Sequence, residues 1–174
     1  MTDRSSSLPS LRLDAADWSD GPPHPHDEPA LYDGLLVRRM FAYAIDVVAI
    51  AVLSVAAWMA FGILGAITFG LLIPVGIIAI GLIPVCYHTY FLGSRGATPG
   101  MRFFDLEMWS LTGRQPEYVQ AFLATVLFYV SVSLTAFLIL VVALFNDRRR
   151  TLHDMLAGTI VLRRVRPGEA ENQA

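Results

Sequence analysis

The feature that most constrains this chain is a run of 48 residues, from Val47 to Ser94, without a single Asp, Glu, Lys or Arg. A second run of this kind covers the 29 residues from Tyr118 to Asn146. A helix needs about 20 apolar residues to cross about 30 Å of hydrocarbon, because it rises about 1.5 Å per residue. The first run is therefore long enough for two membrane-spanning helices, and the second for at least one.

Composition supports a membrane protein and argues against other classes. Hydrophobic residues make up 55% of the 174 residues and charged residues only 16%, which is too apolar for a soluble domain of this size. The net charge is −2, so no basic surface points to nucleic acid. The sequence contains no zinc-ligand spacing, phosphate loop or nucleophile motif. We therefore expect no enzyme activity, no metal site and no cofactor.

The two runs predict an all-α membrane protein with two full transmembrane helices and a third apolar segment. We expect the first helix over about 35–61, a glycine-rich turn around Gly62 and Gly65, and a second helix that ends near Leu92. The third segment, 118–146, is either a single straight span or a re-entrant hairpin. The hairpin places all thirteen arginines on the cytoplasmic side, as the positive-inside rule favours, but each of its halves is too short to cross fully.

Polar segments flank and separate the apolar runs. Residues 1–33 predict a disordered, acidic and proline-rich tail, 34–165 a membrane domain, and 166–174 a second disordered tail. Residues 102–110 alternate loosely and predict a possible strand. A short helix is expected around 153–157, followed by the β-branched run 159–162. This run can pair with residues 103–108 as a small cytoplasmic sheet.

Asp46 is the most informative residue, because it lies inside the first predicted helix. An ionised carboxylate in the bilayer costs at least about 2.5–3.5 kcal/mol, so it must be paired, protonated or exposed to water. Arg39 precedes it by two helical turns and lies on the same helix face. Asp46 is therefore either a proton- or cation-binding group or part of a structural ion pair. His88, near the end of the second helix, is interpreted as an ordinary interfacial residue.

Three stretches together resemble the RDD family of small bacterial membrane proteins, which is named for one arginine and two aspartates. They are residues 39–46, residues 97–113 and residues 150–161. The resemblance implies that Arg39 and Asp46 are the family's arginine and first aspartate. Asp154 is the best match to its second aspartate, with Asp147 as the alternative. Met101 stands where relatives usually carry Lys. The secondary candidates in and beside these stretches are Arg38, Thr98, Pro99, Gly100, Arg102 and His153.

Two functions from different classes follow. The first is a small transport component for a cation, a proton or another ligand, which uses Asp46 and is expected to be a homo-oligomer. The second is a non-catalytic scaffold or assembly factor in which Arg39 bridges Asp46 and Asp154 and clamps the C-terminal segment onto the first helix. Both place the chain in the bacterial inner membrane with a cytoplasmic N-terminus. The expected partners are the lipid bilayer and anionic headgroups, which contact the arginines at 148–150.

Overall fold

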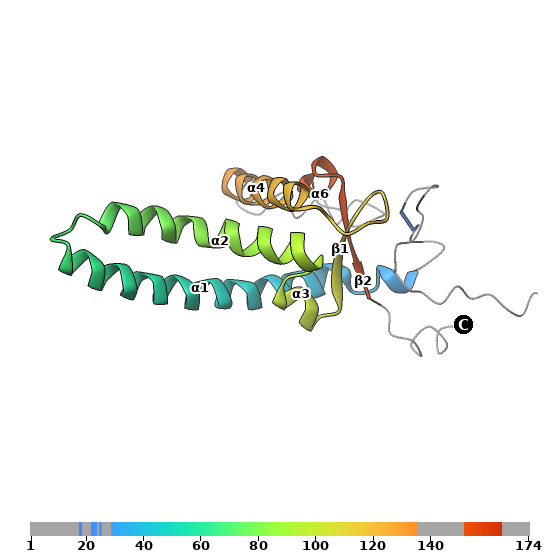
Figure 1. Cartoon of the computed structure of the whole chain (residues 1–174). Coiled ribbons are helices and arrows are strands. Elements are labelled where there is room, and N and C mark those ends of the chain that lie inside the picture. The colour runs from blue at the N-terminus through green and yellow to red at the C-terminus, as the bar shows by residue number, and fades with distance from the viewer. Residues whose placement is uncertain (1–17, 19–21, 24, 26–28, 136–151, 165–174) are drawn as a thin grey trace, which may run out of the picture.

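A long helical hairpin, with short helices and a two-stranded sheet gathered at its open end, forms the fold (Figure 1). The computed structural model describes residues 18, 22–23, 25, 29–135 and 152–164. In chain order the elements are η1 (Pro29–Leu31), α1 (Leu35–Ile67), α2 (Ile73–Arg95), α3 (Pro99–Phe103), β1 (Leu106–Ser110), α4 (Tyr118–Thr135), α6 (Leu152–Leu156) and β2 (Thr159–Arg163). The five short elements η1, α3, β1, α6 and β2 are together called the cap below.

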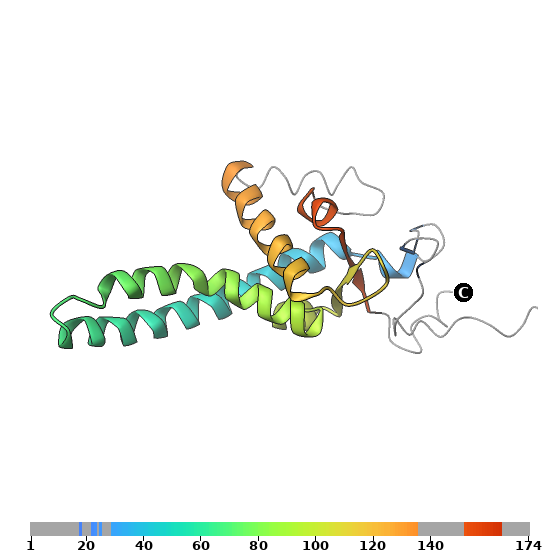
Figure 2. The ribbon, with the colours of Figure 1, turned by 45° about the horizontal axis from the view of Figure 1, so that its top comes forward.

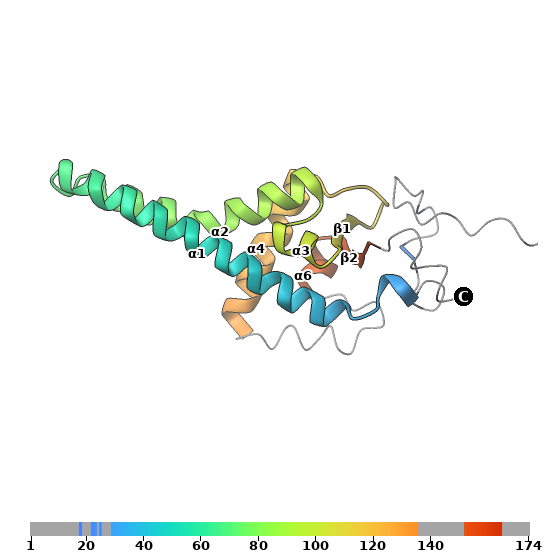
Figure 3. The ribbon, with the colours of Figure 1, turned by 90° about the horizontal axis from the view of Figure 1, so that it is seen from below.

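Helices α1 and α2 are long and apolar enough to cross a membrane. At about 1.5 Å per residue, the 33 residues of α1 extend over about 50 Å, which exceeds the thickness of the hydrocarbon. The charge-free part of α1, after Asp46, covers about 30 Å by the same arithmetic. The far half of the hairpin projects beyond every other described element (Figure 3). Asp46 therefore lies near one margin of the stretch that can cross the hydrocarbon.

The predicted turn around Gly62 and Gly65 is wrong, because α1 continues through both glycines to Ile67. A glycine inside a helix costs only about 1 kcal/mol, and Gly65 has a packing reason to be there: a Cβ would lie 2.9 Å from Cγ1 of Ile73. The chain reverses instead after Ile67, where Gly70 adopts a φ of +89°. The second helix likewise ends at Arg95, slightly later than predicted.

Helix α3 replaces the first part of the predicted strand over 102–110. Thr98 caps this helix, since its hydroxyl accepts a hydrogen bond from the backbone N–H of Met101 at 3.2 Å, and Pro99 begins it, a position where a missing N–H does no harm. The strand begins only at Leu106. The expected pairing is confirmed with shifted bounds: β1 and β2 run antiparallel, with Leu106 opposite Arg163. The side of the membrane on which this sheet lies stays a prediction.

Helix α4 packs against α2 near the cap and then diverges from the hairpin (Figure 2). The apolar run continues to Asn146, but residues 136–151 lie outside the described part of the chain. The choice between a straight span and a re-entrant hairpin therefore stays open. Helix α6 forms within a residue of its predicted position.

The expected end of the N-terminal tail, at residue 33, is wrong. Helix η1 precedes α1, and Leu31 and Tyr32 are buried in the core formed with the sheet. The Tyr32 hydroxyl also donates a hydrogen bond to the carbonyl of Pro23 at 2.6 Å, and the ring of Trp18 lies 5.9 Å from that of Trp109. The folded unit therefore begins at Pro29 or earlier, because these apolar side chains complete the core of the cap.

Candidate functional site

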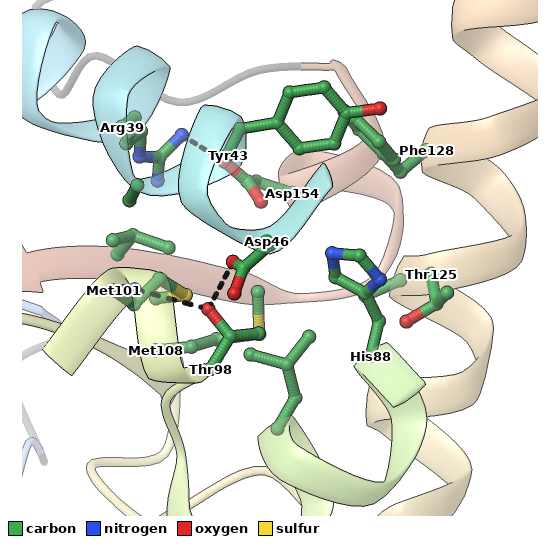
Figure 4. Close-up of a pocket in the computed structure, with 14 residues that line it drawn as sticks. Arg39, Tyr43, Asp46, His88, Thr98, Met101, Met108, Thr125, Phe128 and Asp154 are labelled. Carbon is green, nitrogen blue, oxygen red and sulfur yellow. Dashed lines mark hydrogen bonds and ion pairs between the residues drawn. The ribbon is translucent and has the colours of Figure 1, made fainter. Parts of the chain in front are cut away.

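A cavity of about 130 Å³ lies where α1, α2 and α4 meet the cap. Figure 4 shows charged and polar side chains from different elements pointing toward this space. The carboxylates of Asp46 and Asp154, the guanidinium of Arg39 and the ring of His88 are among its lining groups. The cavity therefore brings together all three residues of the predicted Arg/Asp cluster.

Asp46 is 2% exposed and accepts three hydrogen bonds. Its Oδ1 atom accepts from the Tyr87 hydroxyl at 2.9 Å and from the backbone N–H of Gly100 at 2.9 Å. Its Oδ2 atom accepts from the Thr98 hydroxyl at 2.5 Å. All three donors are neutral, so the carboxylate is solvated by hydrogen bonds without a cation in direct contact among the described residues.

These bonds make Asp46 a junction of three helices, because it lies on α1, Tyr87 on α2, and Thr98 and Gly100 at the start of α3. Gly100 allows the close approach of α1 and α3. A Cβ at this position would overlap the carbonyl oxygen of Ala42 and lie 2.9 Å from Cγ of Asp46. The Thr98-Pro99-Gly100 stretch thus presents one hydroxyl and one N–H to the carboxylate.

Arg39 forms an ion pair with Asp154, and the Nη1–Oδ2 distance is 2.8 Å. The side chain of Asp154 is 1% exposed and that of Arg39 is 17% exposed, so α1 and α6 are held together by a largely buried pair. The expected bridge from Arg39 to both aspartates is half wrong. Arg39 contacts Asp154 only, because neutral donors occupy Asp46. The Nε and Nη2 atoms of Arg39 are buried and have no hydrogen-bond acceptor within the described part of the chain.

The ring of His88, on α2, adds a further polar group to the cavity and lies opposite Asp46 (Figure 4). Its Nδ1 atom lies 3.0 Å from the carbonyl of Pro84 and 3.3 Å from the hydroxyl of Tyr129 on α4. The ring is buried and also packs edge-on against Tyr87. His88, interpreted from the sequence as an ordinary interfacial residue, thus lines the cavity, and Tyr87 beside it binds Asp46. A hairpin necessarily returns the end of its second helix to the start of its first, and this was the signal for both.

The remaining predicted residues do not line this cavity together. Arg38 donates to the carbonyl of Phe104 at 3.2 Å and so ties α1 to the end of α3. Arg102 lines a different, exposed cavity. His153 belongs to α6, and Asp147 lies outside the described residues. No group of three His, Cys, Asp or Glu side chains that suits a metal ion occurs within the described ranges.

Comparison with known proteins matches residues 34–158 to the RDD family. The chain belongs to this family. The match covers the hairpin, α3, the sheet's first strand and α6, and it confirms the resemblance found in the three sequence stretches. Since RDD proteins are membrane proteins, the family and the two apolar helices together indicate a membrane protein.

A protein of Haemophilus influenzae described as uncharacterized is 31% identical to this chain over 80 residues. The matched stretch covers 44% of this chain and 51% of that protein, so it spans about half the length of the relative. No solved structure matches the chain.

Proposed function

We propose that this RDD chain is a multi-pass protein of the bacterial inner membrane and acts as a small transport component that binds a proton or small cation at Asp46. The observation that carries the proposal is a buried carboxylate, solvated only by neutral donors, that lines a cavity near the margin of the hydrocarbon. Buried acids at such depths must be neutralised, paired or hydrated. A proton or a cation that enters this cavity would supply the missing positive charge.

The other lining groups fit exchange with water. Arg39 and Asp154 neutralise each other across 2.8 Å, so Asp46 contributes a net negative charge to the described lining. The Nε and Nη2 atoms of Arg39 have no acceptor among the described residues and need water or a ligand, since buried polar atoms are seldom left unsatisfied. His88 and Tyr129 continue the polar lining toward α4. A hydrated cavity of this kind supports reversible loading of Asp46.

The orientation that we propose follows from the arginines. All seven arginines within the described residues lie at the cap end, and the turn at 68–72 has none. The positive-inside rule therefore favours a cytoplasmic cap and a cytoplasmic N-terminus. Because α1 and α2 expose apolar side chains along their far halves, a polar path across the membrane needs further helices. A homo-oligomer would supply them.

A second function is favoured by a specific observation, namely that the three bonds of Asp46 connect α1, α2 and α3. In this alternative the chain is a non-catalytic scaffold or assembly factor, and the Arg/Asp cluster serves only to hold the cap on the hairpin. The geometry of the ion pair between Arg39 and Asp154 serves both functions equally. The two functions differ in whether the charge of Asp46 is needed: transport requires it, and a scaffold does not.

Proton and sodium flux into liposomes that contain the purified full-length chain tests the proposal. Asp46→Asn keeps a side chain of the same shape and removes the charge, so we expect normal folding and loss of flux. Glu117→Gln is the matched control, because Glu117 is an exposed carboxylate outside the cavity. Unchanged flux in Asp46→Asn overturns a transport role for Asp46. Wild-type flux no higher than that of empty liposomes favours the scaffold.

A further inference from the structure

Three arginines from different elements converge on a second cavity of about 290 Å³, outside the Asp46 cavity. Arg95 is the last residue of α2, Arg102 lies in α3, and Arg164 follows β2. The backbone segment from Asp105 to Glu107 forms the other wall. Residues separated by up to 69 positions in the sequence are thus brought to one place by the fold, and their shared feature is positive charge.

The three arginines are not equivalent. Arg164 is engaged, because its Nη2 atom lies 3.1 and 3.0 Å from the two carboxylate oxygens of the buried Glu107. The guanidinium groups of Arg95 and Arg102 make no hydrogen bond or ion pair with another residue in the described part of the chain. The described lining carries three arginines and two carboxylates, those of Asp105 and Glu107, and so has one positive charge in excess. This arrangement leaves two exposed guanidinium groups available to an anion.

With α2 across a membrane, the end of this helix would place the cavity at the level of the phosphate groups. Arg95 directly follows Ser94, the last residue of the long charge-free run, so its side chain extends from the hydrocarbon margin into the headgroup region. Beside Arg102, the ring of Phe103 is 74% exposed, and Phe41 on α1 is also exposed at this end. Exposed aromatic rings are typical of segments that contact the interface of a bilayer.

We propose that Arg95 and Arg102 bind the phosphate of an anionic phospholipid headgroup, with Arg164 completing the wall of the site. Guanidinium groups suit this ligand, because each presents parallel N–H donors that match two phosphate oxygens. A phospholipid is favoured over a soluble phosphate by the position of Arg95 and by the exposed ring of Phe103, which can contact acyl chains. The proposal is independent of ion binding at Asp46, since no residue is shared between the two cavities.

The test measures lipid retention by the full-length chain. The protein is purified in detergent, titrated with phosphatidylglycerol or phosphatidylcholine, and analysed by native mass spectrometry. Loss of a charged hydrogen-bond donor pair lowers affinity by about tenfold or more. We therefore expect Arg95→Gln and Arg102→Gln each to reduce retention of phosphatidylglycerol by about that factor. Arg102→Lys keeps the charge without the planar fork and should be intermediate.

Arg114→Gln is the matched control, because Arg114 is exposed and does not line the cavity. If Arg114→Gln lost as much phosphatidylglycerol as the two test variants, the effect would be due to net charge alone, and the proposed site would be wrong. Equal retention of phosphatidylcholine would also overturn it. Glycerol phosphate is the soluble arm, and its displacement of phosphatidylglycerol at matched concentration would reassign the site to a soluble phosphate. Thermal unfolding of each variant should stay at the wild-type midpoint, because neither Arg95 nor Arg102 supports another described side chain.

Discussion

We expect Asp46→Ala to destabilise the folded chain far more than Asp46→Asn. The alanine variant leaves three buried donors without their acceptor: the hydroxyls of Tyr87 and Thr98 and the backbone N–H of Gly100. Each buried donor left unsatisfied costs about 1–3 kcal/mol. Removal of the carboxylate offsets part of this loss, because its burial is itself unfavourable, and the cavity of about 130 Å³ has room for water. A net loss of about 2–4 kcal/mol follows.

The asparagine variant keeps much more of this geometry. Its amide oxygen can still accept from Tyr87 and Gly100, and its NH₂ group can donate to the hydroxyl of Thr98, which accepts as well as donates. The main loss is the extra strength of bonds to an ionised acceptor, so we expect a cost of about 1 kcal/mol. The difference between the two variants should therefore be about 2 kcal/mol.

The assay is reversible unfolding in mixed detergent micelles, followed by tryptophan fluorescence and circular dichroism on wild type and variants side by side. Glu117→Ala and Glu117→Gln are the matched pair, and as exposed substitutions they should stay within about 0.5 kcal/mol of wild type. Equal destabilisation by Asp46→Ala and Asp46→Asn would refute the reasoning. It would mean that the charge of the carboxylate, and not its hydrogen bonds, holds the three helices together.

Three further predictions concern other contacts. Arg39→Ala should cost about 3–5 kcal/mol, because it removes the cation from a largely buried ion pair with Asp154, and the double variant with Asp154→Ala should recover part of this loss in the same assay; additive losses would contradict the pair. Gly100→Ala should lower the free energy of unfolding by at least about 1–3 kcal/mol, since its methyl group overlaps the carbonyl of Ala42, and wild-type stability would disprove this close approach. Leu31→Ala should cost about 2–5 kcal/mol; no loss would show that η1 contributes little to the core.

Much of the fold follows from charge alone. The runs without Asp, Glu, Lys or Arg placed both hairpin helices, because only the hydrocarbon requirement explains such length. The sheet was predictable because the β-branched residues at 159–161 follow a helix-terminating glycine. The turn predicted around Gly62 and Gly65 was misplaced because a glycine is only a weak helix breaker. Gly65 stays inside α1, where it lies against Ile73 of α2.

The partners of Asp46 could not be predicted in the same way. Acid–base pairing suggested Arg39, because the two residues share a helix face, yet the fold brings the neutral donors of α3 closer. A signal was present in Thr98-Pro99, since a threonine followed by proline is typical of a helix N-terminus, and helix N-termini favour a carboxylate. Which carboxylate lies there depends on how α3 crosses α1, and spacing along the chain does not contain that information.

The separation of Arg39 from Asp46 changes what the predicted cluster of Arg39, Asp46 and Asp154 can do. If Arg39 bridged both aspartates, its positive charge would lie in direct contact with Asp46 and would compete with any cation that binds there. Instead, Arg39 and Asp154 neutralise each other and attach α6 to α1, whereas Asp46 keeps a carboxylate with neutral partners on the same cavity. Neutral donors solvate a carboxylate without cancelling its charge, and a hydroxyl can turn to accept a hydrogen bond once the acid carries a proton. Under the proposed function, Arg39 and Asp154 stabilise the cap, and Asp46 is the group that binds and releases the cation.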